Sequence, residues 1–283
     1  MKTLTAILTC HNRRQTTLSC LEHLHRQQGP SSLRLRVVLV DDGSTDGTAA
    51  AVREAFPDVR ILHGSGDLYW AGGMRLGFAA ARAVGADYYL WLNDDTQLRP
   101  DALRRLFDAL EEVDDSEEPE AIIVGTTADP ETGRPTYGGR VRCSWWHPLK
   151  YTLVQAASDP TPCEVMNGNC VLIPNAAART VGGIDPHFTH AIADFDYAMR
   201  ARRLGIDIWV APGIVGTCAK NDPSGSWEDA HLSLRERWAR MQGPKGLPVR
   251  EWATYARRYA GPLWPLYAPL PVVRLLFSAL PTK

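Results

Sequence analysis

Short apolar runs alternate with amphipathic helical stretches through the first hundred residues, and this alternation restricts the fold more than any other feature of the sequence. Strands are predicted at residues 5–9, 35–40, 59–63 and 88–92, and helices at 14–27, 46–56, 74–84 and after Pro100. Strands separated by helices form parallel sheets, because each helix returns the chain to the same edge of the sheet. We therefore expect an α/β fold with a Rossmann-like, mostly parallel central sheet flanked by helices.

The composition narrows the class of protein further. The 283 residues are 45% hydrophobic and 22% charged, which excludes collagen-like, disordered and coiled-coil chains. A formal net charge of -1 removes the electrostatic case for a nucleic-acid binder that depends on overall positive charge. No pair of the six cysteines is spaced CxxC and no signal-peptide segment follows Met1, so we expect reduced thiols and a cytoplasmic protein.

The chain beyond Pro223 differs in character from the rest. Residues 235–258 hold seven basic and two acidic side chains, and residues 261–280 are mostly apolar but are interrupted by four prolines and Arg274. The prolines argue against a straight transmembrane helix. Two interpretations stay open for this tail: peripheral attachment to an anionic membrane surface, or packing on the globular core or in a dimer contact.

Acidic side chains follow two of the predicted strands at the point where each strand ends. They are Asp41, Asp42 and Asp46 after the second strand, and Asp94 and Asp95, preceded by Asn93, after the fourth. The carboxyl ends of parallel strands meet at one edge of the sheet, where ligands bind. Carboxylates gathered there need a cationic partner, and a Mg²⁺ or Mn²⁺ ion that bridges to a diphosphate supplies one. Alternatively, Asp42 and Asp46 form turns and cap a helix.

These acidic motifs belong to a longer series that extends to residue 205. In chain order the motifs are Thr9-x-x-Asn12-Arg13, Val40-Asp-Asp-Gly-Ser-Thr-Asp-Gly47, Leu92-Asn-Asp-Asp95, Val181-Gly-Gly-Ile-Asp185 and Ala193-Asp-Phe-Asp-Tyr-x-x-Arg200-x-x-x-x-Gly205. The series resembles glycosyltransferase family 2, most closely its rhamnosyltransferase-like branch. The resemblance implies a GT-A domain at 1–215, with a nucleotide-binding half at 1–95 and an acceptor and catalytic half at 96–215, before a helical extension at 216–283.

The resemblance also implies a reaction and a set of site residues. The enzyme would be inverting and metal-dependent, and would move one sugar from a nucleoside-diphosphate sugar, such as dTDP-rhamnose or a UDP-sugar, to a hydroxyl of a glycan or lipid-linked acceptor. Asp194 matches the catalytic base. The other matching residues are Thr9, Asn12, Arg13, Asp41, Asp42 and Asp94 for the nucleotide, Asp95 for the Mg²⁺ or Mn²⁺ ion, and Gly168 and Asn169 for the sugars.

Trp70 is a further candidate for sugar contact. It lies in a segment predicted to be irregular, where an aromatic face can stack on a sugar ring or simply pack within the loop.

The sequence departs from the family pattern at three places. Asn93 stands at the first DXD position, Ala193 replaces the usual Glu before the base, and Cys218 stands where many relatives carry a metal-binding His. Either the metal shell is incomplete or His231 completes it. The QxxRW signature of processive relatives is also missing, which favours the transfer of one sugar per encounter.

Asp194 opens a helix predicted at 194–204, where the helix dipole favours its ionised form. It would take the proton from the acceptor hydroxyl as that oxygen attacks the sugar. The alternative is that Asp194 only caps the helix and that Asp196 is an exposed neighbour. Two other function classes compete: a nucleotidyltransferase, which would show a glycine-rich basic loop after the first strand, and a non-catalytic sugar-nucleotide binding module.

Overall fold

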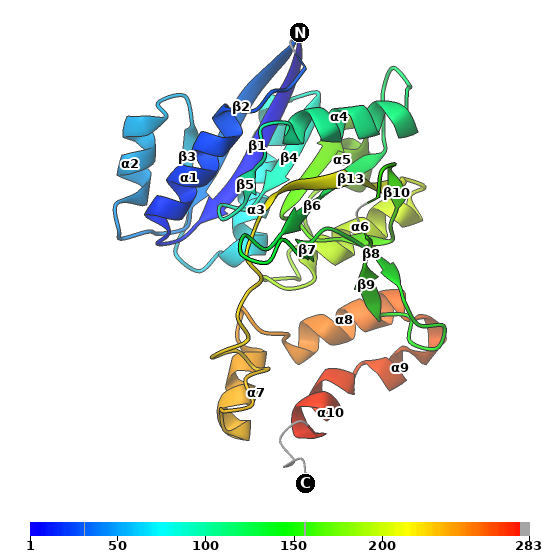
Figure 1. Cartoon of the computed structure of the whole chain (residues 1–283). Coiled ribbons are helices and arrows are strands. Elements are labelled where there is room, and N and C mark those ends of the chain that lie inside the picture. Colours follow the sequence, from blue (N-terminus) through cyan, green and yellow to red (C-terminus); the bar gives the residue numbers. More distant parts are fainter. Residues whose placement is uncertain (31, 156, 278–283) are drawn as a thin grey trace.

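The computed structural model describes residues 1–30, 32–155 and 157–277, and a ten-stranded sheet lies at its centre (Figure 1). The strands are β1 (Lys2–Cys10), β2 (Leu33–Asp41), β3 (Arg60–His63), β4 (Tyr88–Leu92), β5 (Gln97–Leu98), β6 (Ile122–Ala128), β7 (Pro135–Tyr137), β10 (Thr161–Pro162), β12 (Cys170–Pro174) and β13 (Ile208–Thr217). Their order is β10-β13-β6-β12-β4-β1-β2-β3, with β5 beside β13 and β7 beside β6.

Most residue pairs of this sheet are parallel, as predicted. β1 pairs in parallel with β2 and β4, β2 with β3, and β6 with β13. β12 runs antiparallel between β4 and β6, and this strand was not predicted. A second sheet of three strands comprises β8 (Gly139–Arg142), β9 (Tyr151–Leu153) and β11 (Val165–Met166).

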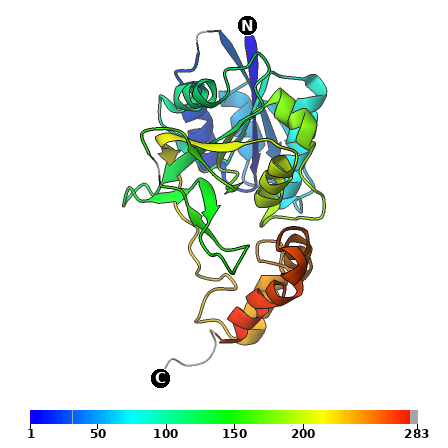
Figure 2. The same ribbon diagram turned by 90° about the vertical axis from the view of Figure 1, so that its right-hand side faces the viewer.

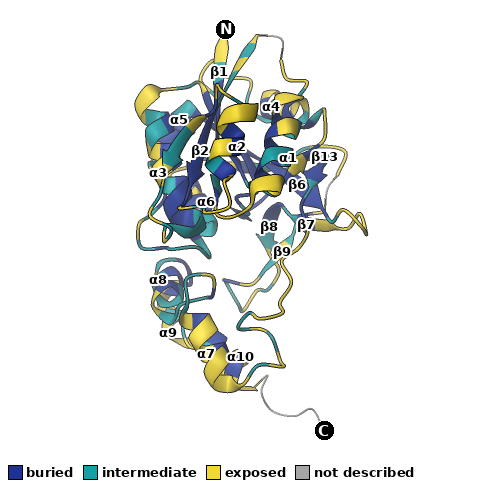
Figure 3. Cartoon of the chain, turned by 90° about the vertical axis from the view of Figure 1, so that its left-hand side faces the viewer, coloured by how far each residue is buried: buried dark blue, intermediate teal, exposed yellow. Residues whose placement is uncertain are grey.

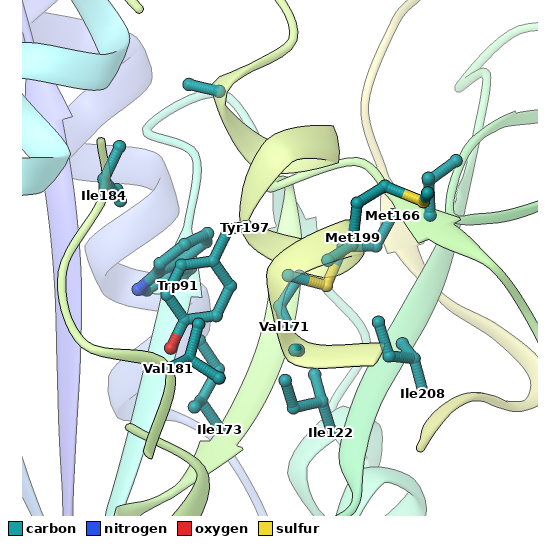
Figure 4. Packing of buried hydrophobic residues seen from close by; sticks show 14 of the residues in the cluster. Trp91, Ile122, Met166, Val171, Ile173, Val181, Ile184, Tyr197, Met199 and Ile208 are labelled. Carbon is teal, nitrogen blue, oxygen red and sulfur yellow. The ribbon is translucent and has the colours of Figure 1, made fainter. Parts of the chain in front are cut away.

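Helices cover both faces of the central sheet. They are α1 (Arg14–His25), α2 (Thr48–Ala55) and α4 (Ala102–Val113) on one face, and α3 (Tyr69–Val84), α5 (Asn175–Val181) and α6 (Ala193–Arg203) on the other. Alternate side chains of β1 divide between the two cores, with Ile7 in one and Leu4 and Leu8 in the other. Figure 4 shows the first core, where the fully buried Trp91 of β4 packs against Tyr197 of α6.

The predicted elements agree with the structure except at several ends. β4 has the predicted bounds, whereas α3 begins at Tyr69, five residues before the predicted start. Trp70 is therefore helical, and its assignment to an irregular segment was wrong. The glycines that obscured this start let α3 approach β1 closely: a Cβ at Gly73 would collide with the Thr9 side chain, and one at Gly77 would lie 2.7 Å from Ile7 Cγ2.

Within the described residues the C-terminal extension is mostly helical beyond Ser233, as predicted, and comprises α7 (Leu234–Gln242), α8 (Val249–Tyr259), the 3₁₀ turn η1 (Gly261–Leu263), α9 (Trp264–Tyr267) and α10 (Leu270–Phe277). These helices lie beyond one end of the sheet, on the side away from the N-terminus (Figures 1 and 2). None of the helices in the described ranges is both long enough and apolar enough to cross a membrane.

Part of the extension packs on the core. Tyr255 and Tyr259 of α8 are buried in the same cluster as Tyr197. Arg258 of α8 contacts the carboxylates of Asp185 and Asp196, each at 2.7 Å. Asp196 is fully buried, so the alternative that made it an exposed neighbour of Asp194 was wrong. Outside this contact, much of α7 and α10 is exposed (Figure 3).

Candidate functional site

A cavity of about 770 Å³ lies at the carboxyl ends of β1, β2 and β4. Its lining includes most of the residues that the sequence singled out: Thr9, Arg13, Asp42, Trp70, Asp94, Asp95, Gly168, Asn169 and Asp194. The predicted meeting of acidic strand ends is therefore found. The volume falls within the roughly 300–1,000 Å³ that is usual for small-molecule sites.

Asp42 organises the wall of this cavity. Its buried carboxylate accepts hydrogen bonds from the backbone N–H groups of Gly66, Leu68 and Tyr69, at 2.8, 2.8 and 3.1 Å. These bonds hold the segment that leads into α3, in which Tyr69 adopts the left-handed φ of 53°. Asp42 thus lines the cavity and also fixes the turn.

Three neighbouring polar residues lie outside the cavity lining and build the loop behind it. Asp41 accepts the N–H of Ser44 at 3.0 Å, and Asn12 accepts the N–H of Thr45 at 2.7 Å. Asp46 accepts the N–H groups of Arg14 and Thr48, each at 3.0 Å. The turn and capping interpretation therefore describes Asp46 well, and Asp41 and Asn12 act on the loop rather than at the cavity surface.

Arg13 joins the two carboxylates at the end of β4. Its guanidinium donates to Asp94 Oδ1 at 3.1 Å and to Asp95 Oδ2 at 2.9 Å. Asp94 is buried, and burial raises its pKa to about 6 even though Arg13 favours the ionised form. The sequence does not reveal this pairing, because Arg13 and Asp95 are 82 residues apart along the chain.

The set of side chains that could coordinate a metal ion is small. Asn93 Oδ1 accepts the indole N–H of Trp70 at 2.7 Å, Cys218 Sγ lies 3.4 Å from Asp95 Oδ1, and His231 is exposed and does not line the cavity. Among the described residues no group of three His, Cys, Asp or Glu side chains could hold a metal. Asp95 still fits a Mg²⁺ or Mn²⁺ ion whose other ligands are substrate phosphates and water, since Mg²⁺ commonly uses one or two carboxylates in this way.

Asp194 faces the cavity from the first turn of α6. Its Oδ2 accepts the N–H of Gly168 at 3.0 Å, and its Oδ1 accepts the N–H of Phe195 at 2.9 Å. Enclosure by the surrounding protein raises the pKa of Asp194 to about 6, so burial outweighs the helix dipole that was expected to lower it.

Trp70 and Gly168 lie in direct contact beside Asp194. A Cβ on Gly168 would collide with the Trp70 ring, so glycine is required for this approach. The Trp70 ring also packs edge-on against Trp91, with the ring centroids 6.1 Å apart. Trp70 therefore connects the loop that contains Gly168 to Asn93 and to the core.

The residues that line the cavity but were not predicted as site residues include Tyr137, His190, Arg240 and Lys245. His190 Nδ1 lies 3.4 Å from the Trp70 backbone nitrogen, and burial, with Lys245 and Arg13 nearby, lowers its pKa to about 4. Arg240 and Lys245 belong to the basic run of the tail, for which the sequence left open a membrane contact or packing on the core or in a dimer contact. The basic run signalled positive charge, but only the fold brings that charge to the cavity.

Solved structures share this fold. The mannosyltransferase PcManGT from Pyrobaculum calidifontis, solved with GDP-Man and Mn²⁺, is 18% identical, with a TM-score of 0.60 over 98% of this chain and 72% of that chain. TarS 1–349 from S. aureus, solved with UDP, is 15% identical, with a TM-score of 0.56 over 91% of this chain and 70% of that chain. The central sheet and its helices are thus those of GT-A glycosyltransferases.

Sequence comparison agrees with the structural likeness. The N-acetylglucosaminyl-diphospho-decaprenol L-rhamnosyltransferase of Mycobacterium tuberculosis is 25% identical over 211 residues, which are 65% of this chain and 67% of that protein. The sequence model described as glycosyl transferase family 2 matches residues 5–179, more than half of the chain. The chain therefore belongs to glycosyl transferase family 2 and is a glycosyltransferase.

Proposed function

We propose that the protein moves a single sugar from a nucleoside-diphosphate sugar to a hydroxyl of a glycan or lipid-linked acceptor, with inversion at the anomeric carbon and Asp194 as the general base. The observation that carries the proposal is the placement of Asp194 in the same cavity as Arg13, Asp94 and Asp95. A carboxylate that can act as a base and a group of charged side chains thereby line the same cavity, as a displacement reaction requires.

The donor's diphosphate would lie against Asp94 and Asp95 and their partner Arg13. Arg240 and Lys245 add positive charge from the C-terminal extension, which suits the negative charge of a diphosphate. A divalent cation, when bound through Asp95, supplies further neutralisation of the departing diphosphate. Thr9 and Asp42 line the part of the cavity nearest β1 and β2, where the nucleoside would lie.

The transfer step would proceed as an in-line displacement. The acceptor oxygen attacks the anomeric carbon while Asp194 takes the proton from that hydroxyl. The bond between the anomeric carbon and the diphosphate oxygen breaks, and the diphosphate leaves with the electron pair. The Gly168 N–H bond leaves Asp194 Oδ2 with further acceptor capacity and holds the carboxylate in place.

Binding of nucleoside diphosphates tests the donor site. We expect a saturating nucleoside diphosphate at about 100 times its Kd to stabilise the protein by about 2.7 kcal/mol, with a larger Tm increase when Mn²⁺ is added. Asp95→Asn should lose the Mn²⁺-dependent part of the increase, and Asp108→Asn, on the exposed face of α4, should keep it. A thermal-shift panel with and without Mn²⁺ measures both; equal Mn²⁺ effects in the two variants would contradict the role of Asp95.

Because the M. tuberculosis relative is a rhamnosyltransferase, dTDP-rhamnose heads the panel, followed by UDP-sugars.

We also propose that the tail makes a peripheral membrane contact, which would present a lipid-linked acceptor to the cavity. Exposed apolar side chains of the tail include Leu234, Trp238, Leu263, Leu266, Val273, Leu276 and Phe277, and the loop after β8 adds Trp145 and Trp146. The Tyr267 hydroxyl donates to the Trp146 carbonyl, so the loop after β8 lies against α9. Exposed basic residues of the tail, including Arg250 and Arg257, favour an anionic surface.

Flotation with anionic liposomes tests the membrane contact. Leu266→Asp should lower the bound fraction by about tenfold, since burying a leucine is worth roughly 1.5–3 kcal/mol. Leu204→Asp is the matched control, because the exposed fractions of Leu204 and Leu266 are similar, at 54% and 63%. Leu204 lies at the end of α6, outside the tail. Equal partitioning of the two variants and the unchanged protein would contradict the contact.

A further inference from the structure

A second cavity, of about 420 Å³, lies within the C-terminal half of the molecule. The loop between β8 and β9, the segment before α7, and helices α8 and α10 form its walls. Most of its lining is apolar: Leu149, Trp227, Leu247, Trp252, Leu270, Pro271 and Val273. The remaining lining residues are His147, Lys150 and Arg274, and no acidic side chain is among them.

Internal contacts fix the walls of this cavity. Trp252 Nε1 donates to the Tyr267 carbonyl at 3.1 Å. The Leu275 side chain of α10 is buried, with an exposed fraction of 1%, and so holds this helix in place. Arg274 pairs with Glu228 at 2.9 Å and lies over the Trp227 ring, 5.7 Å from its centroid. The cavity is therefore built by the fold, and its apolar lining does not depend on a chance gap between loops.

The segment between α7 and α8 lines both the second cavity and the cavity that contains Asp194, here called the catalytic cavity. Gly243, Pro244 and Lys245 line the catalytic cavity, and Leu247, two residues further on, lines the second. The two cavities therefore have this short segment of wall in common.

We infer that the second cavity binds the hydrocarbon chain of a lipid-linked acceptor. This inference rests on the proposed function, because it names where the acceptor's lipid lies when its sugar reaches Asp194. The apolar lining suits an isoprenoid or acyl chain, and the absence of acidic groups from that lining, with Lys150 at its edge, complements the phosphate that joins such a chain to its sugar.

The test uses the full-length protein and geranylgeranyl monophosphate, a probe with a hydrocarbon chain and a phosphate but no sugar. Quenching of tryptophan fluorescence reports binding, since Trp227 and Trp252 line the cavity. The titration is repeated with a saturating nucleoside diphosphate, so that binding of the phosphate in the donor site is excluded. We expect saturable binding under both conditions.

A pair of variants on α10 locates the binding. Val273→Asp places a charge in the lining and should raise the Kd of the probe at least tenfold, whereas Leu276→Asp, on the same helix but outside the lining, should change it less than twofold. Lys150→Gln should weaken the monophosphate but not geranylgeraniol, which lacks the phosphate. Failure of the unchanged protein to bind the probe, or the same Kd in Val273→Asp, would overturn the inference. Equal losses in both α10 variants would also overturn it, because they would indicate a general apolar surface such as a membrane contact.

The proposed function fails in a different experiment, so the two failures are distinguishable. Val273→Asp should keep the full thermal shift with a nucleoside diphosphate, because Val273 does not line the catalytic cavity. With a lipid-linked acceptor the variant should show a KM at least tenfold higher, and with an acceptor that lacks the lipid its kcat/KM should equal that of the unchanged protein. A KM that stays the same for both acceptors would contradict the chain-binding role.

Discussion

Replacing Asp194 with Asn is expected to lower the rate of sugar transfer by about 10²–10⁴-fold, which is the usual contribution of a general base. The substitution keeps the size of the side chain and an oxygen that can accept the Gly168 N–H, so the cavity wall should stay in place. The rate is measured as release of the nucleoside diphosphate in the presence of acceptor. Asp108→Asn, on the exposed face of α4, is the control and should keep the full rate.

The pH dependence gives this prediction a second readout. Because the pKa of Asp194 is raised to about 6, transfer should fall as the pH is lowered through 6 and the base becomes protonated. Asp94 titrates in the same range, so the fall reflects both carboxyl groups. Near-normal transfer by Asp194→Asn at pH 7.5 would remove Asp194 from the mechanism.

The raised pKa of Asp194 also has a consequence for stability. A carboxyl group with a raised pKa binds its proton more tightly in the folded state, so its contribution becomes unfavourable as the pH rises from about 4 to about 6 and stays unfavourable above. Asparagine does not ionise. The Tm of Asp194→Asn minus that of the unchanged protein should therefore be larger at pH 7.5 than below pH 4, because the loss of the oxygen that accepts the Phe195 N–H affects the variant equally at both pH values.

Replacing Asp196 with Ala is expected to have the largest effect on stability, about 3 kcal/mol, or a decrease in Tm of about 6–12 °C. Asp196 is fully buried and accepts from Arg200 at 2.9 Å and from Arg258 and the Tyr259 hydroxyl at 2.7 Å each. Alanine would leave two guanidinium groups without this partner in a place that solvent reaches only in part. Thermal unfolding followed by circular dichroism measures the change.

The effect of Asp196 should also reach the catalytic cavity. Its contact with Arg258 ties α8 to α6, and α8 follows the turn that carries Lys245 to the cavity.

Asp207→Ala, at an exposed position after α6, is the control and should leave the Tm within about 1 °C. A Tm of the Asp196→Ala variant equal to that of the control would show that the buried ion pairs do not stabilise the docking of α8.

Local pattern was sufficient to predict the sheet and the edge at which the cavity lies. The alternation of strands and helices placed Thr9, Asp42, Asp94 and Asp95 at strand ends, and parallel pairing of β1 with β2 and with β4 brings those ends together. Asp194 instead lies in the first turn of α6, which follows α5 and a loop, and its role was taken from the family resemblance. The positions of the four strand-end residues were predictable because each depends on neighbours along the chain.

Long-range contacts were not predictable from the sequence, and they decide what each side chain does. The hydrogen bonds that occupy Asp42 come from residues 24–27 positions away, and the partner of Asp95 lies in the loop after β1. Burial reverses the expected direction of the Asp194 pKa shift, although the hydrogen bond from the Gly168 N–H favours the ionised form. The role of Lys245 at the cavity likewise depends on where α8 docks, which is determined by buried ion pairs and not by periodicity.

The configuration of the transferred sugar tests the central claim most directly. The full-length protein is incubated with Mn²⁺, a nucleoside-diphosphate sugar that stabilises it and a lipid-linked acceptor, and the anomeric centre of the product is assigned by NMR. A single displacement with Asp194 as the base predicts a new glycosidic bond of inverted configuration. A product that retains the donor's configuration, or a donor that binds and is recovered unchanged, would contradict the account.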